Sequence, residues 1–80
     1  MIQTIGFLGG GQLARMSALA AYKLGFKVAV FEATANSPAG MLTKLDFPGS
    51  INDDQKLNEF AGVCDIITLE NEFINPSRLN

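Results

Sequence analysis

Apolar positions form continuous runs in some parts of the chain and recur at helical spacing in others. Residues 2–8 are nearly all apolar, as expected for a parallel strand that is buried on both faces. Residues 27–31 predict a second strand, which Glu32 ends. Between the two strands, residues 12–24 predict an amphipathic helix from the apolar positions Leu13, Met16, Leu19, Ala20 and Leu24.

Gly25 follows this helix, at a place where many helices end in a left-handed residue. Strand, helix and strand together make one βαβ unit, whose crossover we expect to be right-handed. After it, residues 33–40 predict a loop, because Asn36, Ser37, Pro38 and Gly40 are typical turn residues.

The second half of the chain repeats the alternation of strand and helix. A short strand is expected over residues 44–47, because Pro48 and Gly49 cut it off. Asn52 or Asp53 can cap a helix that runs to about residue 61. The inner face of this helix is expected to hold Leu57, Phe60 and Ala61.

Residues 65–69 predict the last clear strand, and Asn75 followed by Pro76 is typical of a helix start. The chain has 80 residues, so that helix has no room to finish, which indicates a piece of a longer protein. We therefore expect a single α/β domain over residues 1–80. Its fold is a Rossmann-like open parallel sheet of about four strands with helices on both faces.

Three glycines, Gly9–Gly11, join the first strand directly to the first helix. Gly9, Gly11 and Ala14 match the pattern G-x-G-x-x-A, in which the glycines allow a tight turn and close approach of the backbone to a ligand. Such a junction presents backbone N–H groups and a helix N-terminus to an anion. The pattern favours a phosphate-bearing ligand, although any tight turn from strand to helix can recruit glycine.

Three other polar positions also follow strand ends or begin a helix. Glu32 lies 21 positions after Gly11, where a carboxylate can bind ribose hydroxyls of a dinucleotide or simply be solvated. Glu70 and Glu72 point the same way if the backbone stays extended, and they then need a donor, a metal, a cationic ligand or solvent. Gln12 in the first helical turn can reach a ligand in the loop or lie on the surface.

Composition excludes several classes of function. The net charge is −2 and the six Lys and Arg residues are scattered, so neither nucleic acid nor an anionic membrane is an expected partner. Histidine is absent, which removes the commonest metal ligand and general base. The single cysteine, Cys64, fits a reducing compartment and is expected to be a small buried hydrophobe. With no signal-peptide pattern and no apolar run long enough to span a bilayer, we expect a cytoplasmic protein.

Three segments resemble the N-terminal domain of the N5-carboxyaminoimidazole ribonucleotide synthetases, a family of purine-pathway enzymes in the ATP-grasp superfamily. They are residues 9–16, which read GGGQLARM, residues 37–40, which read SPAG, and residues 68–73, which read TLENEF. Dinucleotide-binding domains have no standing need for the glutamine in the first segment. The family usually has glycine at the position of Ala14, and here Asn71 and Phe73 are exchanged relative to its common Glu-Phe-Glu-Asn.

The resemblance implies a ligase that uses ATP and bicarbonate to carboxylate the exocyclic amine of 5-aminoimidazole ribonucleotide. It also implies that ATP and Mg²⁺ bind to central and C-terminal ATP-grasp domains outside this chain, and we expect the fragment alone to bind neither and to be inactive. The substrate-binding residues that it implies are Gly10, Gly11, Gln12, Leu13, Glu70 and Glu72. The resemblance further implies that Glu70 orients the ribonucleotide by accepting a hydrogen bond, and that no residue of this chain is catalytic or binds a metal. The family also implies a homodimer at full length.

Two alternatives of other classes remain open. The NAD-binding half of a dehydrogenase explains Gly9, Gly11 and Glu32 as cofactor-binding residues, but it gives no reason for Gln12 or for the pair Glu70 and Glu72. A catalytically silent interaction domain that buries an apolar face against a partner is the other alternative.

Overall fold

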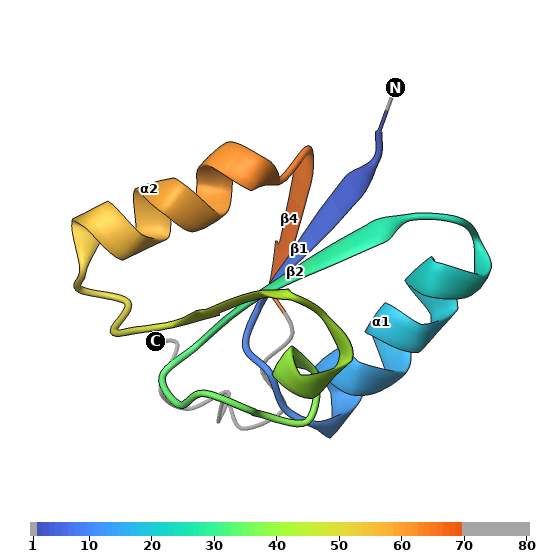
Figure 1. Ribbon diagram of the computed structural model, residues 1–80, viewed down its shortest axis with the longest axis horizontal. Helices are drawn as coiled ribbons and strands as arrows, with labels where there is room; N and C mark the ends of the chain where they lie inside the picture. Colours follow the sequence, from blue (N-terminus) through green and yellow to red (C-terminus); the bar gives the residue numbers. More distant parts are fainter. Residues whose placement is uncertain (1, 70–80) are drawn as a thin grey trace, which may run out of the picture.

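The computed structural model describes residues 2–69, and its elements follow the predicted order (Figure 1). The expected strands and both complete helices are confirmed, with small shifts at their ends. A 3-10 turn that the sequence pattern did not predict begins at the last residue of the predicted loop. The elements are β1 (Thr4–Leu8), α1 (Gln12–Lys23), β2 (Lys27–Glu32), η1 (Gly40–Leu42), β3 (Leu45–Pro48), α2 (Asp54–Val63) and β4 (Ile66–Leu69).

The four strands form one parallel sheet in the order β3-β2-β1-β4. Leu8 of β1 is in register with Phe31 of β2 on one side and with Leu69 of β4 on the other. All strands therefore end along the same edge of the sheet. The chain moves outward to one side through β2 and β3 and then crosses to the other side of β1, so the order reverses between β1 and β4. Ligands of open α/β sheets commonly bind beside such a reversal.

The two helices cover opposite faces of the sheet, as predicted (Figure 1). On the α1 face, Phe7, Val28 and Val30 of the strands pack against the helix. The helix presents only small side chains to them, namely Ala14, Ala18 and Ala21. Methyl groups at these positions let the helix backbone approach the sheet closely.

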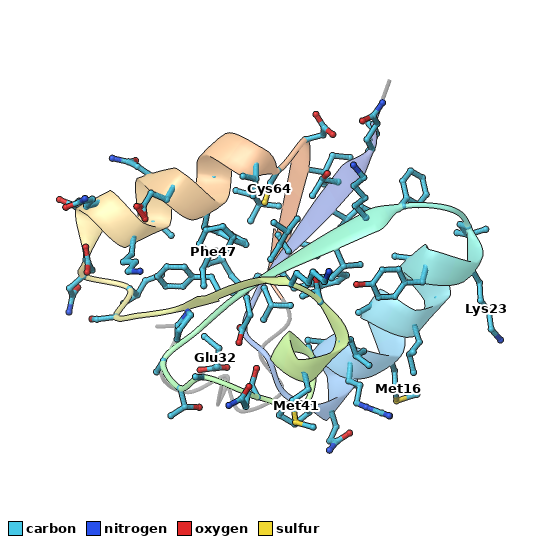
Figure 2. The ribbon with its side chains drawn as sticks, viewed as in Figure 1. Met16, Lys23, Glu32, Met41, Phe47 and Cys64 are labelled. Carbon is cyan, nitrogen blue, oxygen red and sulfur yellow. The ribbon has the colours of Figure 1, made fainter. Side chains whose placement is uncertain are left out.

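The apolar stripe that predicted α1 does not form its buried face. Leu13, Met16, Leu19, Ala20 and Leu24 are exposed, and Met16 and Leu24 keep 64% and 76% of their surface accessible. Figure 2 shows Met16 on the outer side of the helix. The helix carries an alanine stripe beside a larger apolar stripe, and close packing on the sheet selects the alanines. The sequence pattern identified the helix but not the side that packs on the sheet.

On the opposite face, Phe60 of α2 is fully buried against Phe31 and Phe47, with ring centroids 5.5 Å and 5.8 Å away. Asp53 is the N-cap, since its Oδ1 accepts a hydrogen bond from the Lys56 N–H at 3.1 Å, which decides between the two predicted caps. Leu57 is half-buried in this cluster, as expected. Ala61 is exposed, so its predicted inward position was wrong. It follows the buried Phe60 directly, and successive residues of a helix point about 100° apart around its axis.

Cys64 lies at the end of α2, between helix and sheet (Figure 2), and is half-buried rather than fully buried. Its Sγ contacts the Phe60 carbonyl oxygen at 3.1 Å. Burial, with a smaller contribution from the neighbouring Asp65 carboxylate, raises the pKa of the thiol. The prediction that Cys64 is a buried apolar side chain is therefore confirmed only in part, because the residue is half-buried.

Candidate functional site

The carboxyl edge of the sheet carries a hollow of about 520 Å³. Residues that end or follow all four strands line it, among them Leu8, Glu32, Gly49 and Leu69. The glycine loop begins at this hollow with Gly9. The sequence placed candidate ligand-binding residues at this edge, and the structure joins the strand ends there into one concave surface.

The first two glycines hold the loop close to β2. Gly9 has a φ of 109°, a conformation that side chains disfavour, and its N–H donates to the Phe31 carbonyl oxygen at 2.8 Å. Gly10 is buried, and a Cβ there would overlap Ser37, lying 2.8 Å from its Cβ and closer still to its Oγ. Glycine is therefore required at these two positions for different reasons, backbone conformation in one case and space in the other.

Glu32 lies at the end of β2 in the lower half of Figure 2 and binds this loop directly. Its Oε2 accepts a hydrogen bond from the Gly10 N–H at 2.7 Å, and its Oε1 accepts one from the Ala33 N–H at 2.7 Å. Hydrogen bonds from N–H groups to a carboxylate are charge-assisted and strong. Two loop N–H groups, those of Gly9 and Gly10, are thus paired inside the protein. This geometry does not favour the dinucleotide alternative, which requires the carboxylate for ribose hydroxyls.

The segment around Ser37 supports the loop from its other side. The Ala39 N–H donates to the Gly10 carbonyl oxygen at 2.9 Å. Ser37 is 7% exposed, and its Oγ accepts from the Gly40 N–H at 3.1 Å. Two of the three segments that carry the family resemblance, GGGQLARM and SPAG, are therefore bonded to each other. The sequence predicted a loop here but gave no role for Ser37.

Asp46 of β3 is a second residue that sequence reasoning missed. Its Oδ2 accepts from the Asn36 N–H at 3.3 Å, and its buried Oδ1 has no hydrogen-bond partner within residues 2–69. A Cβ on Gly40 would lie 2.6 Å from that Oδ1, so glycine makes room for the carboxylate. A single aspartate in a short strand gives no sequence signal for such a contact.

Gln12 and Leu13 lie in the first turn of α1, as expected. Gly11 is the N-cap and contributes no side chain, so the first N–H groups of the helix depend on partners outside it. Gln12 and Arg15 line a second hollow of about 400 Å³, together with Asn36 and Pro38. The helix start is thus accessible beside the glycine loop, in an arrangement suited to binding an anion or a polar ligand.

Glu70 and Glu72, like the predicted helix start at Asn75, lie outside the described residues. The residue before Glu70 is in register with Leu8, the last residue of β1 before the glycine loop. The chain therefore leaves β4 beside the loop, as the parallel topology requires. Within residues 2–69, no cluster of three potential metal-ligating side chains is found, and no helix is long and apolar enough to cross a membrane.

Comparison with known proteins identifies the fold and its family. The ribonucleotide synthetase preATP-grasp domain model matches residues 2–80. The chain belongs to this family. The Rossmann-like open parallel sheet predicted from the sequence is thereby confirmed.

Individual relatives agree with this assignment. A phosphoribosylaminoimidazole carboxylase of Ogataea methanolica is 40% identical over 79 residues, covering 96% of this chain and 14% of that protein. An N5-carboxyaminoimidazole ribonucleotide synthase of Bacillus subtilis is 38% identical over 76 residues, covering 95% of this chain and 20% of that protein. The chain thus spans between 14% and 20% of the length of these relatives.

Solved structures of the same enzymes are similar to it. An N5-carboxyaminoimidazole ribonucleotide synthetase in complex with ADP superimposes with a TM-score of 0.83 at 41% identity, covering 91% of this chain and 19% of that one. The enzyme of Aspergillus clavatus, in complex with ADP and 5-aminoimidazole ribonucleotide, gives a TM-score of 0.75 at 34% identity, covering 98% and 21%. The resemblance predicted from the three sequence segments is confirmed.

Proposed function

We propose that this chain is the N-terminal, ribonucleotide-binding domain of an N5-carboxyaminoimidazole ribonucleotide synthetase. The observation that carries the proposal is the placement of the glycine loop at the carboxyl end of β1, beside the end of β4, in a fold of this family. The proposal includes central and C-terminal ATP-grasp domains outside this chain, in a cytoplasmic homodimer. We call the longer protein that contains this chain as its N-terminal domain the complete enzyme.

In the proposed reaction, ATP phosphorylates bicarbonate to carboxyphosphate and releases ADP. The exocyclic amine of 5-aminoimidazole ribonucleotide then attacks the carboxyl carbon and a C–N bond forms. The bond from that carbon to the phosphate oxygen breaks, phosphate leaves, and the nitrogen loses a proton. ATP and Mg²⁺ belong to the further domains, and the chain itself binds neither. Its part is to hold the ribonucleotide so that the amine is correctly oriented, which lowers the entropic cost of the attack.

Six residues of this chain make the proposed substrate site. The backbone at Gly10 and Gly11 shapes the turn, and Gln12 and Leu13 begin the helix that follows. Glu70 accepts a hydrogen bond from the ribose or the amine, and Glu72 completes the polar contacts. These roles require positioning and no proton transfer, which suits a chain without histidine.

The test is ATP hydrolysis by the complete enzyme. We expect it to depend on bicarbonate and to be stimulated by 5-aminoimidazole ribonucleotide, with formation of the carboxylated product. ATP turnover that is indifferent to the ribonucleotide would overturn the proposal. Micromolar binding of NAD in a calorimeter would instead support the dehydrogenase alternative.

Replacement of Glu70 tests the residue-level part of the proposal. We expect Glu70→Ala to raise the KM for the ribonucleotide about 10-fold or more, as loss of a hydrogen bond with a charged partner implies, and to spare the KM for ATP. Glu59→Ala, on the exposed surface of α2, is the matched control. An unchanged KM for the ribonucleotide in Glu70→Ala would remove this residue from the site.

A further inference from the structure

The carboxylate of Glu32 is turned inward at the site where dinucleotide-binding domains turn one outward. Both of its oxygens accept backbone N–H groups, one from Gly10 and one from Ala33, each at 2.7 Å. The side chain is half-buried and connects two segments that are 22 residues apart in the sequence. It therefore joins the end of β2 to the centre of the glycine loop.

Both backbone polar groups of Gly10 form hydrogen bonds with residues that end or follow β2. Its N–H donates to Glu32, and its carbonyl oxygen accepts from the Ala39 N–H at 2.9 Å. Because Gly10 is buried, an unpaired N–H there would be costly, and the Glu32 carboxylate supplies its acceptor. The bond to Glu32 thus defines the loop conformation before any ligand arrives.

The same bond determines which part of the loop can meet a ligand. The Gly10 N–H is already donated, and the negative carboxylate beside it disfavours a phosphate at that point. The residues left to contact a ligand are therefore Gly11 and those in the first turn of α1, which begins one residue later. The position of that helix start relative to the sheet depends on how firmly Gly10 is held.

We propose that Glu32 is a positioning residue that fixes the glycine loop, through the Gly10 N–H, in the conformation that receives the ribonucleotide. This inference rests on the proposed function. It assigns Glu32 no contact with the substrate. Preorganisation of this kind strengthens binding because the loop does not have to be ordered when the ligand binds.

The experiment compares Glu32→Gln and Glu32→Ala in the complete enzyme, with Glu59→Gln on α2 as the matched control. Glutamine keeps the length of the side chain and one acceptor oxygen, whereas alanine keeps neither. We expect the KM for the ribonucleotide to rise about 3-fold to 10-fold in Glu32→Gln and about 10-fold to 50-fold in Glu32→Ala, following the loss of one or two charge-assisted bonds. The KM for ATP and the control should change less than about twofold.

Two kinetic results would overturn the inference. One is an unchanged KM for the ribonucleotide in both variants. The other is a parallel rise of the KM values for ribonucleotide and ATP together with a lowered Tm, since a residue that merely stabilises the fold affects both substrates. If Glu32→Ala does not fold, the comparison between wild type and Glu32→Gln decides, because that variant exchanges a single oxygen for an NH₂ group.

Amide hydrogen exchange separates this inference from the proposed function. In the complete enzyme without ligands, the peptide that contains Gly10 should exchange at least about 10-fold faster in Glu32→Gln than in wild type, because its acceptor is weakened. Equal exchange would refute the positioning role whatever the enzyme's substrate is. Faster exchange in an enzyme that ignores the ribonucleotide would refute the proposed function and leave the bond between Glu32 and the loop established.

Discussion

At the scale of single residues, the candidate site depends on glycines whose missing side chains leave room for their neighbours. Gly10 leaves the space that Ser37 fills, and Gly40 leaves the space that Asp46 fills. Hydrogen bonds hold both contacts in place. The Ala39 N–H donates to the Gly10 carbonyl oxygen, and the Asn36 N–H donates to the Asp46 carboxylate. The glycines that are typical of a phosphate-binding loop therefore also allow this loop to pack closely against residues 37–40.

Gly10→Ala should displace the loop, because its Cβ would overlap the side chain of Ser37. In the complete enzyme we expect the KM for the ribonucleotide to rise about 10-fold, which is about 1.4 kcal/mol of lost binding. The double variant Gly10→Ala with Ser37→Gly removes the overlapping atoms and should recover at least half of that loss in free energy.

The control for this variant is Gly62→Ala in α2, where an added Cβ meets nothing within 4 Å. It should leave both KM values unchanged and stabilise the helix by about 0.5–1 kcal/mol. Steady-state kinetics and thermal unfolding measure these effects. A Gly10→Ala enzyme with the KM of wild type would show that the space beside Ser37 is not needed for binding.

At the scale of elements, the sequence predicted which helices and strands form, and in what order, better than it predicted which face of a helix packs on the sheet. Glycine and proline at the ends and the aspartate cap bounded each element to within a few residues, because these signals act locally. The buried face of α1 could not be predicted, since Leu13 and Met16 give a stronger apolar signal than Ala14 and Ala18 but are too large for close packing on the sheet. The choice between two apolar stripes is made by the partner surface, which is distant in sequence.

On the α2 face, Phe60 is the one residue of the helix that is buried. Phe60 is fully buried between Phe31 and Phe47. We expect Phe60→Ala to lower the free energy of unfolding by about 3–5 kcal/mol, from lost burial and the cavity left behind. Leu24→Ala, at a position that is 76% exposed, should change it by less than about 0.5 kcal/mol.

Denaturant unfolding of both variants measures this difference. A loss below about 1 kcal/mol for Phe60→Ala would mean that the cluster between α2 and the sheet is not the main attachment of the helix. The α1 face has no equivalent single residue, because its contacts are spread over three alanines.

At the scale of the whole molecule, one carboxylate binds backbone N–H groups at the carboxyl ends of the strands and another does so at their amino ends. Glu32 binds backbone N–H groups at the carboxyl edge, and Asp65 binds those of Gln3 and Thr4 at the amino edge. The sequence pattern placed both the glycine loop and the residues after the last strand behind strand ends of a parallel sheet, and such strand ends share one edge. It could not predict the partner of Glu32, because a bond from a side chain to a backbone N–H 22 residues away leaves no periodic pattern.

Asp65 makes the stability of the whole fold depend on pH in the acid range. Its Oδ2 accepts the Gln3 N–H at 2.8 Å and the Thr4 N–H at 2.9 Å, joining the start of β4 to the start of β1. These bonds, that of Gln3 first, lower the pKa of the carboxyl below its ordinary value. The unfolded chain therefore binds the proton more readily than the folded one.

It follows that the contribution of Asp65 is fully present above its unfolded pKa, about 4, and is lost as the pH falls through the lower folded value. Asp65→Asn should accordingly flatten the decline of Tm between about pH 5 and pH 2 relative to wild type, and lower Tm most at neutral pH. Asp54→Asn, on the exposed first turn of α2, is the matched control for the change of charge. If the Tm difference between Asp65→Asn and wild type were the same at pH 7 and pH 2.5, the strand starts would not be joined by an ionised carboxylate.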